Sequence, residues 1–343
     1  MKTTEEFDKF YNLNLKSDLD FLESARLASN NKYSFKPYKR NLLVLLGLII
    51  LVVIIVKKTH WLPEKAYFIV PFCMLYALFH PIYILYKRGD NFIPINTDFK
   101  DKIINKIVRF LDPGFKYEQA KGLEKNIIDS TELFESFGFF RSDDLISGTI
   151  SEHPFVLSDI SATKDVVITK SQGKERDRRH VTIFKGVYAV LSFESGFQTP
   201  LYINSKKLLD NLFSPELLNT LNDLTQRQEQ NSRLKNFVLT GDQTFDPLFH
   251  VRSSDPMNEL PKLNAEIRKL IISAKGLTNT PIHVAFLKNE IHVAIEDTAS
   301  FEMDSFTSFT NSKYVKHYFN LLNVFVGLSE GLINVIQKEK HTQ

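Results

Sequence analysis

Two apolar runs near the N-terminus constrain this chain more than any other feature. The first, Leu42–Val56, contains no polar side chain, and the second, Ala66–Tyr86, is 21 residues long. A helix needs about 20 residues to cross the hydrocarbon core of a bilayer. Basic residues flank the shorter first run and aromatic residues lie near the ends of the second, as is typical of membrane interfaces. We therefore predict a transmembrane helical hairpin, with the lipid bilayer as the partner of residues 42–86; a core hairpin of a soluble protein is the alternative.

The basic residues around the two runs predict the orientation of the hairpin. Four precede it, four follow it and three lie in its loop: Lys32, Lys36, Lys39 and Arg40; Lys87, Arg88, Lys100 and Lys102; and Lys57, Lys58 and Lys65. Because loops richer in lysine and arginine stay in the cytoplasm, we expect both termini to be cytoplasmic. The first 35 residues contain no apolar stretch like that of a cleavable signal peptide.

Charge and cysteine content exclude two broad classes of protein. The net charge of +3 over 343 residues is too small for a protein that binds nucleic acid through its overall charge, so no nucleic-acid partner is predicted. The single cysteine, Cys73, lies within the second apolar run. It excludes intrachain disulfides and a cysteine-rich zinc site, and it is compatible with a reducing compartment.

The order of apolar and polar patterns predicts an α+β protein with five consecutive parts. These are N-terminal amphipathic helices, the transmembrane hairpin, juxtamembrane helices with a first α+β subdomain, a helical linker, and a second α+β subdomain, at residues 1–40, 41–88, 89–205, 206–235 and 236–343. The linker is placed by the helix start signal Ser214-Pro215-Glu216 and by the polar stretch 226–232.

Capping residues and apolar spacing predict the helices. Thr4 and Ser17 are expected to begin two N-terminal helices, and Thr97 is expected to cap a helix over Asp98–Leu111. Further helices are expected over Glu118–Asn126, Asn258–Ser273 and Lys313–Ile336, the last of them covering the sheet.

Alternating apolar residues predict the strands. Short strands are expected at Phe155–Ile160, Asp165–Thr169, Val181–Phe184, Tyr188–Phe193, Leu201–Ile203, Ile282–Leu287 and Glu290–Ile295. The last two should form a hairpin with its turn at Lys288-Asn289. The segment 170–180 carries five basic and two acidic residues and is expected to be a solvated loop; contact with lipid headgroups or with an acidic partner is the alternative.

An eleven-residue similarity points to an internal repeat. Phe134–Asp144 aligns without gaps to Phe245–Asp255, with identical residues at Phe134/Phe245, Arg141/Arg252, Ser142/Ser253 and Asp144/Asp255. Duplication of one α+β unit would explain the similarity and would make the two subdomains related. Independent use of the same turn residues is the alternative.

No complete catalytic or metal-binding motif is present. The sequence lacks a phosphate-binding glycine loop, G-x-S-x-G, H-E-x-x-H and a cysteine pair. Asp143, Asp144 and Glu152 are candidates for an acidic site, and His283 and His292, expected on one face of a hairpin, are candidates for a metal site. Neither group offers a nucleophile with a positioned base or a clear third metal ligand. We therefore assign no catalytic, cofactor-binding or metal residues and predict no cofactor; ordinary turn and sheet roles are expected.

Several short stretches, in their order and spacing, are similar to a bacterial family of membrane proteins. They are Leu22-Glu23 with Arg26; Phe99-Lys100 with Ile103-Ile104; Asp112-Pro113-Gly114-Phe115-Lys116-Tyr117; Ser130 with Leu133-Phe134; Asp143-Asp144-Leu145-Ile146-Ser147-Gly148 with Ser151-Glu152; Phe184-Lys185-Gly186-Val187; Phe245-Asp246-Pro247-Leu248-Phe249 with Ser254-Asp255; and Phe301-Glu302. On these residues the chain resembles the family catalogued as domain of unknown function 3137, from about Phe21 to Asn334. The stretch 256–261 departs from the Arg- and Tyr-rich helix start expected there. The resemblance implies a two-span protein of the bacterial cytoplasmic membrane with a cytoplasmic α+β region, and it implies no reaction.

The leading functional hypothesis is a membrane-tethered, non-enzymatic interaction or scaffolding module with a protein partner at the cytoplasmic face of the membrane. A tether raises the local concentration of the α+β region at that surface. The alternatives are an enzyme of membrane metabolites acting through Asp143, Asp144 and Glu152, and a lipid-binding domain that uses the segment 170–180.

Overall fold

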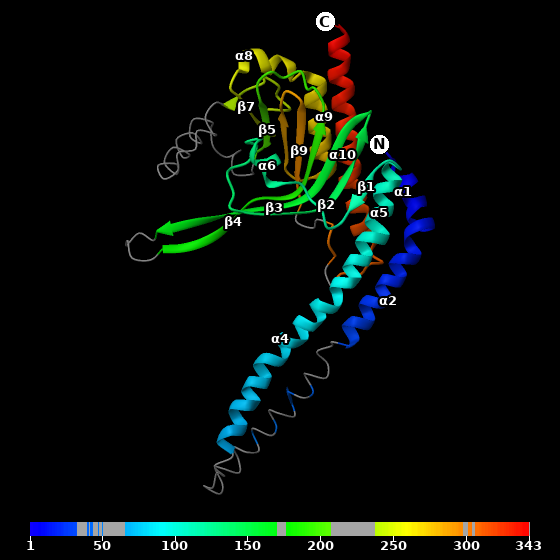
Figure 1. Cartoon of the computed structure of the whole chain (residues 1–343), viewed down its shortest axis with the longest axis vertical. Helices are drawn as coiled ribbons and strands as arrows, with labels where there is room; N and C mark the ends of the chain where they lie inside the picture. The colour runs from blue at the N-terminus through cyan, green and yellow to red at the C-terminus, as the bar shows by residue number, and fades with distance from the viewer. Residues whose placement is uncertain are drawn as a thin grey trace. The chain divides into compact units, whose positions relative to one another are not determined.

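The computed structural model describes residues 1–32, 40, 42–43, 47, 50, 66–169, 176–206, 237–297, 301–303 and 306–342 (Figure 1). The chain forms two compact units, each assembled from segments that are far apart in the sequence. The sheet unit consists of Met1–Phe10, Ile104–Phe301 and Lys313–Gln343, and the helical unit consists of Tyr11–Ile103 and Glu302–Ser312.

The sheet unit is built on a nine-stranded sheet in the order β1-β2-β3-β4-β9-β8-β5-β7-β6, and its strand pairs are antiparallel. The strands of the described residues are β1 (Lys116–Glu118), β2 (Phe139–Ile150), β3 (His153–Thr169), β4 (Arg176–Ser192), β5 (Leu201–Ser205), β6 (Phe237–Val238), β7 (Phe249–Ser253), β8 (Ile282–Phe286) and β9 (Glu290–Glu296). With the helices that pack on it, this sheet confirms the predicted α+β class.

One sheet unites the two stretches that were expected to be separate subdomains, 89–205 and 236–343. β9 and β8 come from the second stretch, yet they lie between β4 and β5 of the first. β4 pairs with β9 from Gly186↔Glu296 to Ser192↔Glu290, and β5 pairs with β8. The expected boundary therefore does not divide the sheet. Nearly all of the predicted linker, 206–235, lies outside the described residues.

The strands β3 and β4 are longer than the sequence pattern indicated. β3 contains the two strands predicted at Phe155–Ile160 and Asp165–Thr169. β4 contains the strand predicted at Val181–Phe184 and most of the strand predicted at Tyr188–Phe193. Their pairing continues to Thr169↔Arg176, so residues 176–180 of the expected loop are strand, while 170–175 lie outside the described residues. Polar residues between apolar segments do not end a strand whose backbone groups remain paired with a neighbour.

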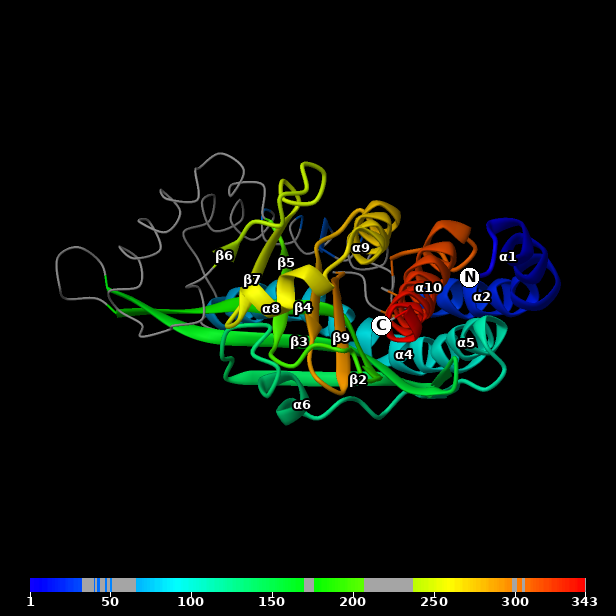
Figure 2. The same cartoon turned by 90° about the horizontal axis from the view of Figure 1, so that it is seen from above.

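Helices cover both faces of the sheet. Figure 2 shows α9 (Ala265–Thr278) and α10 (Ser312–Thr342) on one face and α6 (Lys125–Asp129) on the other. On the α6 side, the hydrophobic core includes Leu133, Phe137, Phe184 and Tyr188. The predicted helix over Glu118–Asn126 is wrong, because residues 116–118 form β1 at the edge of the sheet and the helix begins only at Lys125.

The helix predicted over Asn258–Ser273 is replaced by three shorter elements. Asp255 caps the short α8 (Pro256–Glu259), and the 3-10 turn η6 (Leu260–Lys262) follows. Pro261 lacks an N–H group and interrupts the run. α9 then starts after Asn264, whose side chain accepts a hydrogen bond from the N–H of Ile267 at 2.9 Å.

α10 corresponds to the predicted final helix and is part of the sheet unit. Val315, Tyr318, Phe325 and Leu332 are among its buried residues. Within the described residues it is also the one helix that is long and apolar enough to cross a membrane, over Ser312–Lys340, although 61% of its most apolar stretch is buried inside the protein. Core helices of soluble proteins meet the same criterion, so α10 is only weak support for membrane association.

The second apolar run is helical, but its helix extends well beyond the run. α4 spans Ala66–Phe99 and is followed directly by the π-helix η2 (Lys100–Ile104) and by α5 (Asn105–Leu111). The predicted cap at Thr97 and helix start at Asp98 are wrong. The Thr97 hydroxyl donates to the carbonyl of Ile93 at 3.1 Å, a bond that lets threonine stay inside a helix. The first run lies mostly outside the described residues, so the hairpin is not confirmed.

The N-terminal helices follow one another without a break. They are α1 (Thr4–Phe10), the π-helix η1 (Tyr11–Leu15) and α2 (Lys16–Lys32). Thr3, rather than the predicted Thr4, caps α1: its hydroxyl accepts from the N–H of Glu6 at 3.2 Å, and the Glu6 carboxylate accepts from the N–H of Thr3 at 2.7 Å. This reciprocal pair is a capping box. Ser17 lies inside the helical segment and does not begin a helix.

Within the helical unit, Glu23 links α2 to the segment 302–312. Its carboxylate accepts two hydrogen bonds from the Arg26 guanidinium, at 2.9 and 2.6 Å, and one from the N–H of Phe309 at 3.0 Å. Phe309 is buried and packs against Phe92 and Phe99 of α4. These contacts assign a structural role to Glu23 and Arg26, two residues that carry the family resemblance.

Candidate functional site at an acidic bulge

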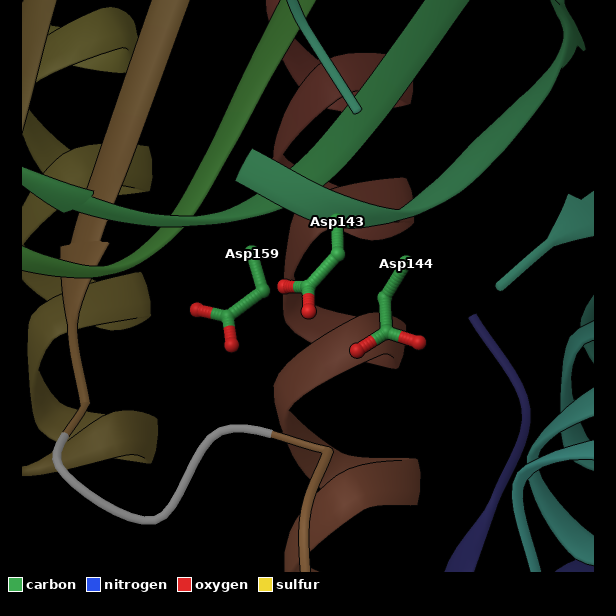
Figure 3. A group of neighbouring side chains, drawn as sticks. All are labelled: Asp143, Asp144 and Asp159. Carbon is green, nitrogen blue, oxygen red and sulfur yellow. The ribbon is translucent and has the colours of Figure 1, made fainter. Parts of the chain in front are cut away.

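The structure brings three aspartates together next to a β-bulge. One carboxylate oxygen from each of Asp143, Asp144 and Asp159 lies within 4.8 Å of the other two (Figure 3). Glu152, the third residue of the predicted acidic site, does not belong to this group. Asp159 was missed because only the β2–β3 register, in which it pairs with Asp143, places it beside the other two.

The bulge lies at Asp144 and Leu145. The β2–β3 register shifts between Asp143 and Ile146, and Asp144 has a left-handed backbone with φ of 59°. The freed N–H groups of Asp144 and Leu145 donate to the carbonyls of Gln119 and Lys121, each at 3.0 Å. The bulge therefore attaches β2 to the segment that follows β1.

The acidic side chains of the bulge are engaged with the protein. Asp144 is fully buried, and the hydroxyl of Tyr117 donates to its Oδ1. Asp143 accepts from the guanidinium of Arg141 at 2.8 Å. Ser158, which is also buried, donates to the backbone carbonyl of Asp143. These contacts assign a role in fixing the bulge to the Asp144 side chain and to the backbone carbonyl of Asp143.

Chemically, the three carboxylates could supply oxygen ligands to Mg²⁺ or Ca²⁺, the ions that prefer such donors. Both ions usually take six or more oxygen ligands, from protein, substrate or water, whereas this group provides one oxygen from each of three residues. Acidic clusters of this kind are common in proteins without a metal, and two of its members already have the partners described above. We assign no metal to the site.

The two histidines predicted on one face of the β8–β9 hairpin do lie on that face. The register pairs Ala285 with His292 and His283 with Ala294. Each imidazole has its own partners: His283 contacts Asn204 at 3.0 Å and Glu296 at 3.2 Å.

The second histidine, His292, is fully buried and joins two polar side chains. Its Nδ1 lies 3.0 Å from the Tyr188 hydroxyl and its Nε2 lies 2.9 Å from Glu290. Burial raises the pKa of Tyr188, so its phenol is neutral. Among the described residues, neither histidine belongs to a group of three metal-binding side chains.

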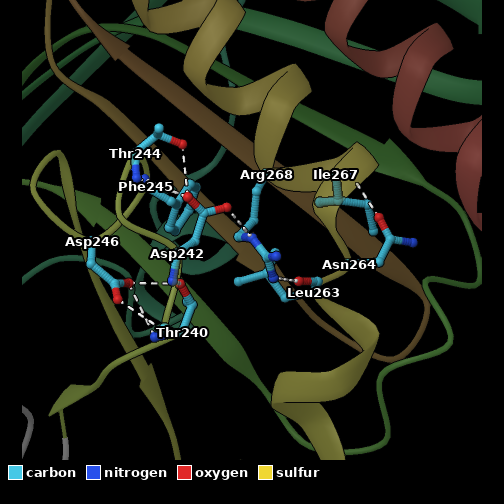
Figure 4. Close-up of polar contacts among 10 residues, drawn as sticks. Thr240, Asp242, Thr244, Phe245, Asp246, Leu263, Asn264, Ile267 and Arg268 are labelled. Atoms are coloured by element: carbon cyan, nitrogen blue, oxygen red, sulfur yellow. Dashed lines mark hydrogen bonds and ion pairs between the residues drawn. The ribbon is translucent and has the colours of Figure 1, made fainter.

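A further polar network, which the sequence analysis did not predict, orders the loop before β7 (Figure 4). Asp242 accepts from the N–H and hydroxyl of Thr244 at 2.9 and 2.7 Å and from Arg268 at 2.9 Å. The hydrogen bonds from Thr244 are the main cause that holds the pKa of Asp242 well below its usual range. Asp246 accepts from the N–H of Thr240 at 3.0 Å. Hydrogen bonds from nearby residues to aspartate side chains stabilise turns. We therefore assign this network a structural role in the loop.

The internal repeat stays a prediction. Each copy leads into a strand, β2 or β7, but the two final aspartates are used differently. Asp144 occupies the bulge, whereas Asp255 caps α8 by accepting a hydrogen bond from the N–H of Asn258 at 3.4 Å.

His317 and Asp297 form an ionisable pair at the end of β9. Their Nε2 and Oδ2 atoms are 2.7 Å apart; Asp297 is buried and the His317 side chain is 40% exposed. The hydrogen bond that His317 donates to the Asp297 carboxylate raises the pKa of His317 above its usual 6.5, against the opposing effect of burial. The pair therefore stabilises the folded state below the unfolded-state pKa, and this contribution is lost as the pH rises through the higher folded-state pKa.

We expect His317→Gln to remove this pH-dependent contribution. The effect should stay below about 1 kcal/mol, because solvent screens a pair that is this exposed. In thermal melts between about pH 5.5 and about pH 8.5, the melting temperature of the variant should differ most from that of the wild type at the acidic end. His180→Gln, at an imidazole that is 72% exposed, is the matched control. It should change the melting temperature less than His317→Gln does. A His317→Gln effect that does not vary with pH would contradict the assignment.

The fold defines an α+β protein with a large antiparallel sheet and long helices on it. Residues 182–333, from β4 to α10, match the family described as Protein of unknown function (DUF3137). The family expected from the sequence is thereby confirmed.

Comparisons with individual proteins add little. No curated protein matches the sequence. The chain is similar to the crystal structure of the mycobacterial trehalose monomycolate transport factor A, TtfA, with 10% identity and a TM-score of 0.30 over 64% of this chain and 95% of the other. A similarity at this level carries no argument about the fold or the function of this chain.

Proposed function

We propose that the protein is a membrane-tethered, non-enzymatic interaction module. In this proposal residues 42–86 form two spans of the bacterial cytoplasmic membrane, both termini are cytoplasmic, and the sheet unit meets a protein partner at the cytoplasmic face. The observation that supports membrane tethering is the exposed apolar surface of α4.

Large apolar side chains of α4 are exposed at helical spacing. Leu75, Phe79, Ile82 and Tyr86 are 48%, 61%, 59% and 63% exposed, and Tyr83 beside them is 53% exposed. Positions three and four residues apart share one side of a helix, so these residues form a continuous apolar surface. Soluble proteins rarely leave such a surface in water. A bilayer would cover it and would also accommodate the apolar first run.

The interaction role is supported by what the polar candidates do in the structure. Asp144 is buried under Tyr117, and His292 is buried between Tyr188 and Glu290. An enzyme of this kind would need a carboxylate or imidazole that can reach a substrate. The lipid-binding alternative depends on residues 170–180, of which 170–175 lie outside the described residues.

Cysteine labelling tests the tether and its orientation. In a Cys73→Ala background, Thr59→Cys, outside the described residues, should react with a membrane-impermeant thiol reagent in intact cells. Met257→Cys, at a side chain that is 86% exposed in the sheet unit, should react only after lysis. The two variants should differ by more than about tenfold in labelling, because the bilayer blocks charged reagents. Labelling of Met257→Cys in intact cells would reject the proposed orientation.

Photo-crosslinking tests the interaction role. A photoreactive phenylalanine analogue at Met257 or at Leu239, which is 68% exposed, should give a discrete protein adduct in native membranes. The same analogue at the buried Tyr318 is the control and should give none. Adducts to lipid alone would favour the lipid-binding alternative over a protein partner.

A further inference from the structure

The strands β3 and β4 continue past the rest of the sheet as a two-stranded ribbon. Their pairing runs on through residues 164–169 and 176–181, which we call the β3–β4 ribbon. β2 pairs with β3 no further than Thr163, and β9 pairs with β4 no further than Gly186. Figures 1 and 2 show the ribbon extending beyond the neighbouring strands. Within the part of the chain that the structure describes, no third strand pairs with the ribbon on either side.

The outer edge of β4 is long enough to accept another strand. It is open from residue 176 to residue 184, since at Lys185 the carbonyl accepts a hydrogen bond from the N–H of Asp297 at 3.1 Å. These residues span roughly 30 Å, more than a strand of ordinary length. An open edge is a template for strand pairing, and a two-stranded ribbon alone is only marginally stable in water. A third strand on this edge would therefore stabilise the ribbon.

The charge of β4 along the open edge indicates which kind of strand fits. Residues 176–184 contain three arginines, Arg176, Arg178 and Arg179, and one acid, Asp177. On the neighbouring strand the acid Asp165 already contacts His180, at 2.5 Å between Oδ1 and Nδ1. Side chains directly opposite each other on paired strands attract if their charges are opposite and repel if they are alike. An acidic strand is therefore favoured, whereas β4 of a second copy would place two basic strands side by side.

We propose that the open edge of β4 binds an extended acidic segment of a protein partner as an additional strand. Main-chain hydrogen bonds supply the affinity, and the side chains on the two faces supply the specificity. Acidic side chains of the partner lie beside the exposed Arg179, and its apolar side chains contact Val181, which is 42% exposed. This inference rests on the proposed interaction role, and it adds where the partner binds and which charge it carries.

Three labelled peptides test the proposal by fluorescence anisotropy on the full-length protein in phosphatidylcholine nanodiscs. The first alternates glutamate with valine over eight residues, the second has lysine in place of glutamate, and the third is the first with two adjacent prolines inserted at its centre. The first should bind. The other two should bind at least about tenfold more weakly, because the second has the wrong charge and the prolines interrupt strand pairing in the third.

Reversing the charge of β4 should reverse this preference. The double variant Arg178→Glu/Arg179→Glu should bind the glutamate peptide about tenfold more weakly and should bind the lysine peptide instead. Lys121→Glu/Lys338→Glu is the matched control, because it makes the same change of charge outside the ribbon, at side chains that are 65% and 74% exposed. It should leave glutamate-peptide binding within about twofold of the wild type. The glutamate peptide should also slow hydrogen exchange of residues 176–184 in the wild type.

The outcomes separate strand addition from its alternatives. Equal binding of the glutamate peptide with and without prolines would show that charge alone attracts ligands, as expected for lipid headgroups, and would overturn the proposal. Failure of the wild type to bind any of the peptides would show that the arginines only protect an open edge, and it would overturn the proposal as well. Neither result affects the interaction role, which is rejected separately if crosslinking at Met257 and Leu239 captures lipid alone.

Discussion

Replacing Gly186 with alanine is expected to destabilise the sheet unit by about 3 kcal/mol, the sum of overpacking and backbone strain. Gly186 lies in β4 between Ile160 of β3 and Glu296 of β9, with a positive φ of 153°. A Cβ atom there would lie 2.6 Å from the N atom of Asp297 and 2.9 Å from the Cα of Glu296. These are backbone atoms of a central strand, which cannot move without breaking the β4–β9 pairing.

Urea unfolding followed by circular dichroism, together with hydrogen exchange of β4 and β9, measures this effect. Gly276→Ala is the matched control: it makes the same chemical change in α9, where nothing lies within 4 Å of the new Cβ. That variant should be more stable than the wild type by up to about 1 kcal/mol, because alanine favours a helix. A Gly186→Ala protein with wild-type stability and exchange would contradict the close approach of β4 and β9.

Asp144→Ala is expected to cost about 2–5 kcal/mol of stability. The change removes the acceptor of the Tyr117 hydroxyl at a fully buried position, which costs about 1–3 kcal/mol. It also places alanine at a left-handed φ of 59°, which costs about 1–2 kcal/mol. Asp144→Asn keeps a carbonyl acceptor and a residue that tolerates this backbone, so it should lose only about half as much.

Asp143 provides the matched control for this pair of variants. Its side chain is 22% exposed and its partner Arg141 is 70% exposed, so Asp143→Asn and Asp143→Ala should each change stability by less than about 1 kcal/mol. Combining Asp144→Ala with Tyr117→Phe should recover part of the loss, because the hydroxyl that would lack a partner is gone. Additive losses would show that Tyr117 and Asp144 are not coupled.

The same variants distinguish a structural bulge from an acidic active site. If the aspartates fix the bulge, any cellular phenotype should follow protein abundance, with alanine worse than asparagine. If Asp144 acts in catalysis or binds a metal, the asparagine variant should be stable and inactive. Thermal melts with complementation at matched expression separate these outcomes, and a stable but inactive Asp144→Asn protein would place the enzyme alternative ahead of the interaction module.

Sequence reasoning predicted the elements whose signals are local. The β8–β9 hairpin, with both histidines on one face, follows from alternation and a two-residue turn, and α10 follows from helical spacing. The helix boundaries were less well predicted. The cap predicted at Thr97 was wrong because a threonine hydroxyl can either bond to a carbonyl of the preceding helical turn or cap the start of a new helix. The sequence alone does not distinguish these two roles.

The α+β class, the helical second apolar run and the family resemblance could be predicted from the sequence, because each depends on short-range periodicity or on residues in a fixed order. The tertiary structure alone decided that β8 and β9 insert between β4 and β5, that Asp159 joins Asp143 and Asp144, and that β3 and β4 continue past the ends of β2 and β9. These arrangements depend on strand order and register between distant segments. Alternative strand registers differ in free energy because different side chains pack against one another across the strands. No local sequence pattern specifies which distant side chains will pack together.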